Sequence, residues 1–477
     1  MLKITSKKEI TIYLILMLIY LTVAFSYGKL AFNEKYTERS LTSLEQVMGH
    51  ESTISVGNDY GMIYSIDGKP ISAKYDNVFC AVDGYSEIVG CESVGIIHEL
   101  SPILLSNDSK SNRTVRQGNN IVTTLSSKGM KTAHEMLADY NSQDIRASIC
   151  VVLADGAVLV DAGNNTYASD AFKNPDNYND IFCNYNSMPE LKGSSFKPVI
   201  YRMLLTHKNE LSDEFNFVDG EFQDISEFRI GDRTICNWDH DYPGNYDGSI
   251  GDVLQRKCTL ADLLKFSSNT APLRICNSIG FDKAYKYLND DFQIKSPLVT
   301  EVNKLIAVTP SEDEMVDYFF GQGANISSLR MCQLFNYLVS GEFTVPFYCA
   351  SVIQPDGKVL YKAKPKPIDK YKLQIDVEND ILNNALEDTF ESYITPNLRQ
   401  KFPDKLLSSR RILAKSGTAE LGNGNDNRVL MMTVMNKERT NVICSACIAI
   451  NNISPNTITN EVLIEKLLYT LSTIGII

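Results

Sequence analysis

The sequence predicts an α/β (α+β) domain built on one antiparallel sheet that is covered by helices. Residues 147–160 alternate apolar side chains on both sides of an Asp-Gly pair, which is the pattern of a β-hairpin. A second strand pair is predicted over 428–435 and 440–450, and residues 460–471 close the chain with apolar residues at helical spacing. Because strands lie at both ends of a region with a helical middle, both ends are expected to contribute to a single sheet.

Length and composition limit the classes of protein that need to be considered. A chain of 477 residues is longer than one hydrophobic core usually supports, so two or three domains are expected. The hydrophobic fraction of 44% and the charged fraction of 22% exclude disordered and fibrous proteins. The formal net charge of -12 argues against a nucleic-acid partner, because phosphate binding requires clustered Lys and Arg.

The N-terminal segment reads as a membrane anchor. Residues 10–27 are uncharged and apolar over nearly the length that crosses a bilayer core, and three lysines before them hold the N-terminus in the cytoplasm. A cleaved signal peptide begins in the same way, but this run is long for one and residues 25–29 lack a small-x-small cleavage pattern. We therefore expect a cytoplasmic tail at 1–9, a single-pass membrane anchor at 10–27, and an extracytoplasmic remainder.

Two domains are expected outside the membrane. Residues 28–140 are polar and contain Asp-Gly turn signals between strand-like runs, which favours a small, mostly-β juxtamembrane domain. Residues 141–477 have a plausible size for one catalytic domain.

The eleven cysteines do not indicate a disulfide framework, because their number is odd and their spacing is irregular. Cys444 and Cys447 form a CxxC, but they lie in a predicted buried strand, where positions three apart face opposite sides of the sheet. Buried free thiols are the preferred interpretation. No histidine motif and no second CxxC completes a metal site, so neither a metal nor a cofactor is expected.

The segment 192–198, Lys-Gly-Ser-Ser-Phe-Lys-Pro, combines a serine with a lysine three positions later. An apolar helical pattern follows, so Ser194 is expected at a helix N-terminus, where backbone N–H groups stabilise negative charge. Lys197 then lies on the same face, and with a lowered pKa it can take the serine proton. A capping serine beside an unrelated lysine has the same spacing, and composition alone predicts about two such matches.

A second segment, Phe-Ser-Ser-Asn-Thr, contains Ser267 and Asn269. The Ser267 hydroxyl can relay a proton, and the Asn269 amide can bind a substrate amide. A polar loop between helices is the alternative interpretation of this short pattern.

A third segment is 414–420, Ala-Lys-Ser-Gly-Thr-Ala-Glu, on a predicted strand. Lys415 and Ser416 can present a cation and a hydroxyl to a carboxylate. Gly417 is expected to let a substrate backbone approach closely, and the N–H of Thr418 is available for an oxyanion hole.

The ordered triple Ser-x-x-Lys, Ser-x-Asn, Lys-Ser-Gly resembles the penicillin-binding proteins and serine β-lactamases. The Gly-Gln-Gly at 321–323 and Asn237-Trp238 also resemble family segments. One anchor, a short outer domain and one catalytic domain resemble a class B penicillin-binding protein. Over about residues 147–477, the resemblance implies the penicillin-binding transpeptidase fold with a five-stranded antiparallel sheet.

The resemblance implies a D,D-transpeptidase that cross-links peptidoglycan stem peptides and is acylated by β-lactams. It makes Ser194 the nucleophile, Lys197 the general base, Ser267 a proton relay and Asn269 a substrate amide contact. The other implied contacts are from Lys415 and Ser416 to the D-alanyl carboxylate, and from the N–H groups of Ser194 and Thr418 to the oxyanion. It also implies that the membrane is a bacterial cell membrane and that a polytopic glycosyltransferase in it is a partner.

The sequence departs from the family pattern at two places. Family members usually have Pro where Lys192 stands, and residues 60–68 lack the Arg and first Asp of the usual juxtamembrane signature. Two other functions stay open: a non-catalytic β-lactam or muropeptide sensor or scaffold, and a β-lactamase. The β-lactamase requires a base and a positioned water for deacylation, for which the sequence offers no clear candidate.

Overall fold

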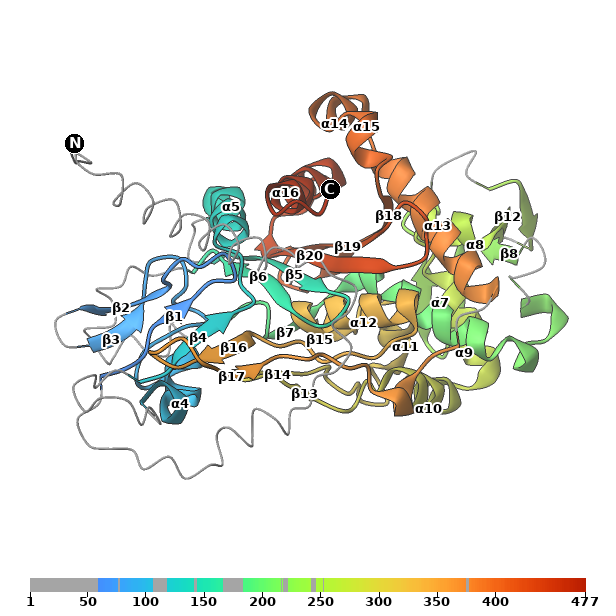
Figure 1. Ribbon diagram of the computed structural model, residues 1–477. Coiled ribbons are helices and arrows are strands. Elements are labelled where there is room, and N and C mark those ends of the chain that lie inside the picture. Colours follow the sequence, from blue (N-terminus) through green and yellow to red (C-terminus); the bar gives the residue numbers. More distant parts are fainter. Residues whose placement is uncertain are drawn as a thin grey trace.

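The structure is a computed structural model that describes most of the chain after residue 58 (Figure 1). The predicted tail at 1–9, the predicted anchor at 10–27 and the start of the predicted outer domain lie outside the described residues. Within the described part, no helix has the length and apolar character needed to cross a membrane. The described residues are 59–75, 78–105, 118–140, 144–165, 183–215, 217, 222–241, 246–251, 253–374 and 377–477.

A five-stranded antiparallel sheet forms the centre of the fold, in the order β18-β19-β20-β5-β6. The predicted hairpin at 147–160 is confirmed, because β5 pairs with β6. The second predicted strand pair is confirmed as β19 and β20, and β20 also pairs with β5, so the two ends of the region share one sheet. The bounds are β5 Arg146–Leu153, β6 Val158–Gly163, β18 Arg411–Glu420, β19 Asp426–Met435 and β20 Val442–Ile453.

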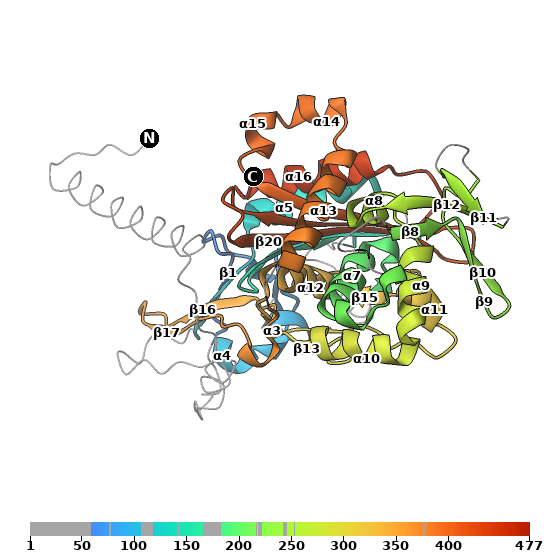
Figure 2. The same cartoon turned by 90° about the vertical axis from the view of Figure 1, so that its right-hand side faces the viewer.

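Helices cover both faces of this sheet (Figures 1 and 2). Helix α12 (Ser328–Ser340) packs on one face against β5, β19 and β20. On the other face, α5 (Ser127–Leu137) and α16 (Asn460–Thr473) pack against each other and against the sheet. The predicted C-terminal helix is thus present. Both faces of the sheet are buried, which explains why its strands are almost continuously apolar.

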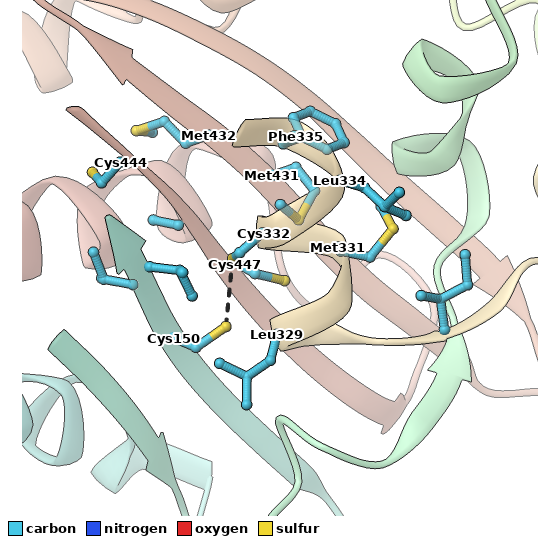
Figure 3. Packing of buried hydrophobic residues seen from close by; sticks show 14 of the residues in the cluster. Cys150, Leu329, Met331, Cys332, Leu334, Phe335, Met431, Met432, Cys444 and Cys447 are labelled. Atoms are coloured by element: carbon cyan, nitrogen blue, oxygen red, sulfur yellow. Dashed lines mark hydrogen bonds between the residues drawn. The ribbon is translucent and has the colours of Figure 1, made fainter. Parts of the chain in front are cut away.

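Small sulfur-containing side chains line the contact between α12 and the sheet (Figure 3). Cys447 on β20 is the direct register partner of Cys150 on β5, and the Cys150 and Cys332 Sγ atoms are 3.6 Å apart. Burial raises the pKa of all three thiols, which keeps them protonated. Cys444 and Cys447 are buried free thiols, as predicted.

The described part of the predicted outer domain shares a β-sheet with strands from later in the chain. Its strands β1 (Ile63–Tyr64) and β4 (Asn120–Thr123) join β16 (Cys349–Ile353) and β17 (Val359–Lys362) in one four-stranded sheet. The sheet therefore combines strands from both sides of residue 140, and α5 packs against the far end of the chain. The remaining elements here are β2 Ser72–Tyr75, β3 Val78–Ala81, α3 Gly95–Glu99, α4 Ser101–Leu105 and the 3₁₀ turn Ala138–Tyr140.

The elements not yet described come from one region of the sequence, between β6 and β18. Its helices are α7 Lys197–Thr206, α8 Leu260–Lys265, α9 Thr270–Ile279, α10 Phe281–Phe292, α11 Met315–Phe319, α13 Val377–Tyr393, α14 Pro396–Lys401 and α15 Asp404–Leu407. Its strands are β7 Pro189–Leu191, β8 Phe222–Ile225, β9 Glu227–Ile230, β10 Arg233–Cys236, β11 Gly248–Ile250, β12 Val253–Cys258, β13 Leu298–Val299, β14 Lys304–Leu305 and β15 Asn325–Ser327. The 3₁₀ turns are η4 Gly193–Phe196, η5 Lys208–Glu210, η6 Asp213–Phe215 and η7 Asp369–Tyr371.

Candidate active site

Ser194 lies in the 3₁₀ turn η4, immediately before α7. The helix starts at Lys197 with Pro198 in its first turn, a position where proline's missing N–H costs nothing. Positions three apart in a 3₁₀ turn are eclipsed, so the backbone directs Ser194 and Lys197 to the same side. The apolar residues of α7 are fully buried, which fixes this turn against the core.

Strand β18 packs directly against η4. A Cβ on Gly193, whose φ is +55°, would lie 2.3 Å from the carbonyl oxygen of Thr418 and 2.9 Å from its nitrogen. The Thr418 backbone therefore touches the residue that precedes Ser194, as an oxyanion hole built from the two N–H groups requires. β18 is also an edge strand of the central sheet, the kind of edge to which an extended peptide can add.

The reason predicted for Gly417 was incomplete. A Cβ at Gly417 would meet the carbonyl oxygen of Lys192 at 2.2 Å and the nitrogen of Ser195 at 2.6 Å. The protein's own turn η4 thus makes a close approach that by itself requires glycine at this position. Glycine at this position lets η4 lie against the β18 backbone.

The Gly-Gln-Gly segment at 321–323 also contacts turn η4, which contains Ser194. A Cβ at Gly321, whose φ is +98°, would lie 2.4 Å from the carbonyl oxygen of Gly193. The Gln322 side chain accepts a hydrogen bond from the N–H of Glu420 at 3.2 Å, just past the third motif. The segment therefore supports η4 and β18 from a third direction.

Lys197 is fully buried beneath the second motif. Its Nζ donates to the carbonyl oxygen of Ser267 at 2.7 Å and to Oδ1 of Asn269 at 2.8 Å. Burial, followed by the nearby Lys415, holds the pKa of Lys197 well below its usual value. A neutral amine has two N–H groups and a lone pair. Because both N–H groups have acceptors here, the lone pair is free to accept a proton.

The second motif is a helix C-terminus. The N–H of Ser267 bonds to the Leu264 carbonyl at 3.2 Å and that of Ser268 to the Leu263 carbonyl at 3.0 Å, which is the Schellman pattern at the end of α8. This pattern puts Ser267 in the left-handed region, with φ of 56°. The helix ending thus turns the Ser267 carbonyl to Lys197 while its hydroxyl meets Lys415.

Lys415 reaches across from β18 to the second motif. Its Nζ donates to Oγ of Ser267 at 3.0 Å and to the carbonyl oxygen of Ser416 at 2.8 Å. Burial lowers the pKa of Lys415 from 10.5 to about 7. An incoming carboxylate would raise that pKa again and favour the charged amine, so Lys415 is poised to become a cation when an anion binds.

Two residues at this site were not expected from the sequence. The Tyr393 hydroxyl at the end of α13 lies 2.9 Å from Oγ of Ser416 and orients that side chain. Lys192, which stands where family members usually have Pro, is completely buried. Its Nζ donates a hydrogen bond to Oγ of Ser328 at 2.9 Å and lies 4.0 Å from a carboxylate oxygen of Glu190. It joins the nucleophile turn to the start of α12. Neither contact has a local sequence signal.

The described residues hold no cluster of three His, Cys, Asp or Glu side chains arranged for a metal. His207 ends α7, where its Nε2 lies 3.1 Å from an Asp291 carboxylate oxygen. This contact ties the end of α7 to α10.

Residues 149–462 match the family described as penicillin binding protein transpeptidase domain. The chain belongs to this family. The resemblance to penicillin-binding proteins predicted from the sequence is therefore confirmed. The α/β transpeptidase fold with its five-stranded antiparallel sheet is also the expected one. A search among curated proteins found no match.

Solved structures of penicillin-binding proteins share the fold. The D,D-transpeptidase domain of a peptidoglycan glycosyltransferase from Eggerthella lenta has a TM-score of 0.65 and 18% identity, over 88% of this chain and 100% of that one. Penicillin binding protein 3 from Mycobacterium tuberculosis has a TM-score of 0.67 and 16% identity, over 88% and 97%. Penicillin-binding protein A from M. tuberculosis, as a ceftriaxone acyl-enzyme complex, has a TM-score of 0.63 and 13% identity, over 87% and 98%.

The positive φ of Ser267 in this penicillin-binding protein gives a matched pair of variants. Ser267→Ala and Ser267→Gly both remove the hydroxyl, but only glycine adopts a φ of 56° without strain. We expect the glycine variant to be more stable than the alanine variant by about 1 kcal/mol, measured by urea unfolding. Equal stability of the two variants would contradict the left-handed conformation.

Burial of Lys415 gives a pH-dependent cost to folding. The pKa is about 7 in the folded protein and 10.5 when exposed, so the unfolded chain binds more protons between these values. The free energy of unfolding is therefore highest above pH 10.5 and decreases as the pH falls towards 7. We expect Lys415→Met to be more stable than the wild type at pH 7 by on the order of 2–3 kcal/mol, after the loss of its two hydrogen bonds. The difference should shrink towards pH 10 in thermal unfolding.

Proposed function

We propose that this protein is a D-Ala-D-Ala transpeptidase that cross-links peptidoglycan stem peptides through an acyl-enzyme on Ser194, and that β-lactams acylate the same serine. The observation that carries the proposal is the convergence of three motifs at one point. Lys197 bonds both residues of the second motif, Lys415 bonds Ser267, and β18 lies against the Ser194 turn. These segments are about seventy to two hundred positions apart in the sequence.

Acylation follows from these contacts. The neutral Lys197 amine takes the Ser194 proton as Oγ forms a bond to the penultimate D-Ala carbonyl carbon. The oxyanion is bound by the N–H groups of Ser194 and Thr418, and its collapse breaks the peptide bond. The departing D-Ala amine receives its proton from Lys197 through the Ser267 hydroxyl. Lys415 and Ser416 hold the terminal carboxylate, and Asn269 binds a substrate amide.

Deacylation reverses the proton path. An amine of a neighbouring stem peptide attacks the Ser194 ester and gives up its proton through Ser267 to Lys197, and Ser194 Oγ leaves with a proton from the same lysine. The product is a cross-linked peptide and the free enzyme.

Membrane localisation and partners form part of the same proposal. The uncharged run at 10–27 supports a single-pass anchor, with the N-terminus in the cytoplasm and the catalytic domain on the extracytoplasmic side. A D,D-transpeptidase at that surface meets peptidoglycan, and a polytopic glycosyltransferase in the membrane is the proposed source of its glycan strands.

The test is intact-mass spectrometry of the 477-residue chain in detergent after incubation with benzylpenicillin, beside Ser194→Ala. We expect a stable adduct of one penicillin on the wild type and none on the variant. An adduct that disappears within seconds would favour a β-lactamase. The absence of any adduct on the wild type would contradict the acyl-enzyme proposal and would favour a non-catalytic sensor or scaffold.

Substrate specificity needs a second measurement. We expect release of D-Ala from an N-acylated L-Lys-D-Ala-D-Ala peptide together with transfer of the acyl group to an added amine. Release without transfer, at every amine concentration, would contradict the transpeptidase assignment and indicate a carboxypeptidase.

A further inference from the structure

Asp224, on strand β8, lies fully buried behind the second motif. Its Oδ1 accepts hydrogen bonds from the hydroxyls of Ser268 at 2.9 Å and Thr270 at 2.7 Å. These two residues flank Asn269, and Ser268 also follows Ser267 directly. One carboxylate oxygen therefore holds the loop from which Ser267 and Asn269 reach Lys197.

The other carboxylate oxygen holds the support for Asn269. Oδ2 of Asp224 accepts from Nδ2 of Asn237 at 3.1 Å, and Oδ1 of Asn237 then accepts the backbone N–H groups of Asn269 at 2.7 Å and Thr270 at 3.2 Å. Asn237 is thus oriented by Asp224 so that its amide oxygen faces the backbone of the second motif. This is the structural role of the Asn237-Trp238 pair noted in the sequence.

A buried arginine completes the network. Arg256 on β12 donates to Oδ2 of Asp224 at 3.1 Å from one terminal nitrogen and to Asp239 at 2.5 Å from the other. Its guanidinium carbon lies 4.6 Å from the ring centroid of Phe266, the residue before Ser267. The charge of Asp224 is therefore paired, as a buried carboxylate requires, and Arg256 stacks under the same loop.

We propose that Asp224 is a positioning residue for acylation, which anchors the loop through which Ser267 and Asn269 contact Lys197. The inference rests on the proposed acyl-enzyme function. Asp224 makes no contact with the reacting atoms and acts through Ser267, Asn269 and Lys197. No local sequence pattern points to Asp224, because an isolated Asp in a short strand has no distinctive pattern.

The charge acts on Lys197 in a definite direction. Burial and Lys415 lower the pKa of Lys197, and Asp224 opposes both by raising it. Removing the Asp224 charge should therefore lower the pKa of Lys197 further, and the rising limb of the acylation rate should move to lower pH. Besides Lys197, the titratable and charged groups that face Asp224 are Arg256 and Cys258 on β12, Arg274 on α9 and Tyr201 on α7.

The experiment measures the second-order rate of acylation of the full chain by a fluorescent penicillin between pH 5 and pH 9. For Asp224→Asn we expect a rate about 10²-fold lower at the wild-type optimum and a rising limb displaced to lower pH. Asp239→Asn is the matched control, since it loosens Arg256 without removing the charge that acts on Lys197. Its limb should stay in place.

The outcomes separate this inference from the proposed function. If the wild type is not acylated at all, the proposed function fails. Two results for Asp224→Asn would overturn the positioning role if the wild type is acylated: a rate within about twofold of the wild type, or an equal loss of rate at every pH. The second result would indicate a merely structural residue, whose removal does not shift the pH dependence of the acylation rate.

A second pair of variants decides the matter if Asp224→Asn does not fold, as thermal unfolding would reveal. Ser268→Ala and Thr270→Val keep the charge and each remove one hydroxyl that anchors the loop. We expect acylation about five- to tenfold slower with an unmoved limb, the loss typical of one hydrogen bond to a charged group. Wild-type rates in both folded variants would overturn the proposal.

Discussion

Lys197→Met is expected to lower the rate of acylation by benzylpenicillin by about 10³–10⁴-fold, the contribution typical of a positioned general base. The methionine side chain occupies nearly the same volume but cannot take the Ser194 proton. Because Lys197 is fully buried and its pKa is held well below its usual value, its removal should not lower the thermal stability. The loss should therefore appear in the rate alone, measured by stopped-flow or quenched intact-mass analysis.

The exposed Lys286 on α10 provides the control, because it pairs only with Asp290 at the surface. Lys286→Met should be acylated at the wild-type rate. A rate for Lys197→Met within tenfold of the wild type would exclude this lysine as the base.

The pH profile gives the same residue a second test. Acylation needs neutral Lys197, so the rate should rise with pH through the pKa of this lysine and then become constant. Since burial and Lys415 lower that pKa, the rise should occur well below the pH at which an exposed lysine titrates. A rate that still increases steeply at pH 10 would show that Lys197 is charged in the free enzyme.

Gly417→Ala is expected to reduce acylation by at least about 10²-fold, because the added Cβ forces β18 away from the nucleophile turn. The atoms it would meet at 2.2 Å and 2.6 Å belong to the backbone of Lys192 and Ser195 and cannot rotate aside. Overpacking of this kind costs about 1–3 kcal/mol, so a measurable fall in the unfolding temperature should accompany the loss. Both quantities come from one preparation, by penicillin labelling and thermal unfolding.

Gly248→Ala on β11 is the matched control. A Cβ there meets the side chain of Gln255 at 3.0 Å, and that flexible chain can move. Its acylation rate should equal that of the wild type. If Gly417→Ala were also acylated normally, the contact between β18 and η4 would not position the oxyanion hole.

Local patterns in the sequence predicted the elements that carry the chemistry. The hairpin of β5 and β6, the pair of β19 and β20 and the final helix α16 follow from the spacing of apolar residues over short distances. The lysine three positions after Ser194 follows from the same kind of local pattern. Their prediction needed no knowledge of what packs against them.

Contacts between distant segments could not be predicted in this way. Strand β4 pairs with β16, more than two hundred residues later, so the region before residue 140 shares a sheet with the catalytic part. Tyr393 meets Ser416 because α13 packs against β18. Such partners are chosen by how whole elements pack, and no short stretch of sequence records that choice.

The sequence by itself determined the three motifs, the helix that follows Ser194 and the two strand pairs of the central sheet, because each of them depends on residues a few positions apart. Only the tertiary structure decided what each group faces. It placed the backbone of Lys192 where a side chain on Gly417 would be, and it put Asp224 against the hydroxyls of Ser268 and Thr270 in the second motif. The environment that lowers the pKa of buried Lys197 comes from neighbours brought together by folding, so the sequence identifies the lysine while the fold sets its pKa.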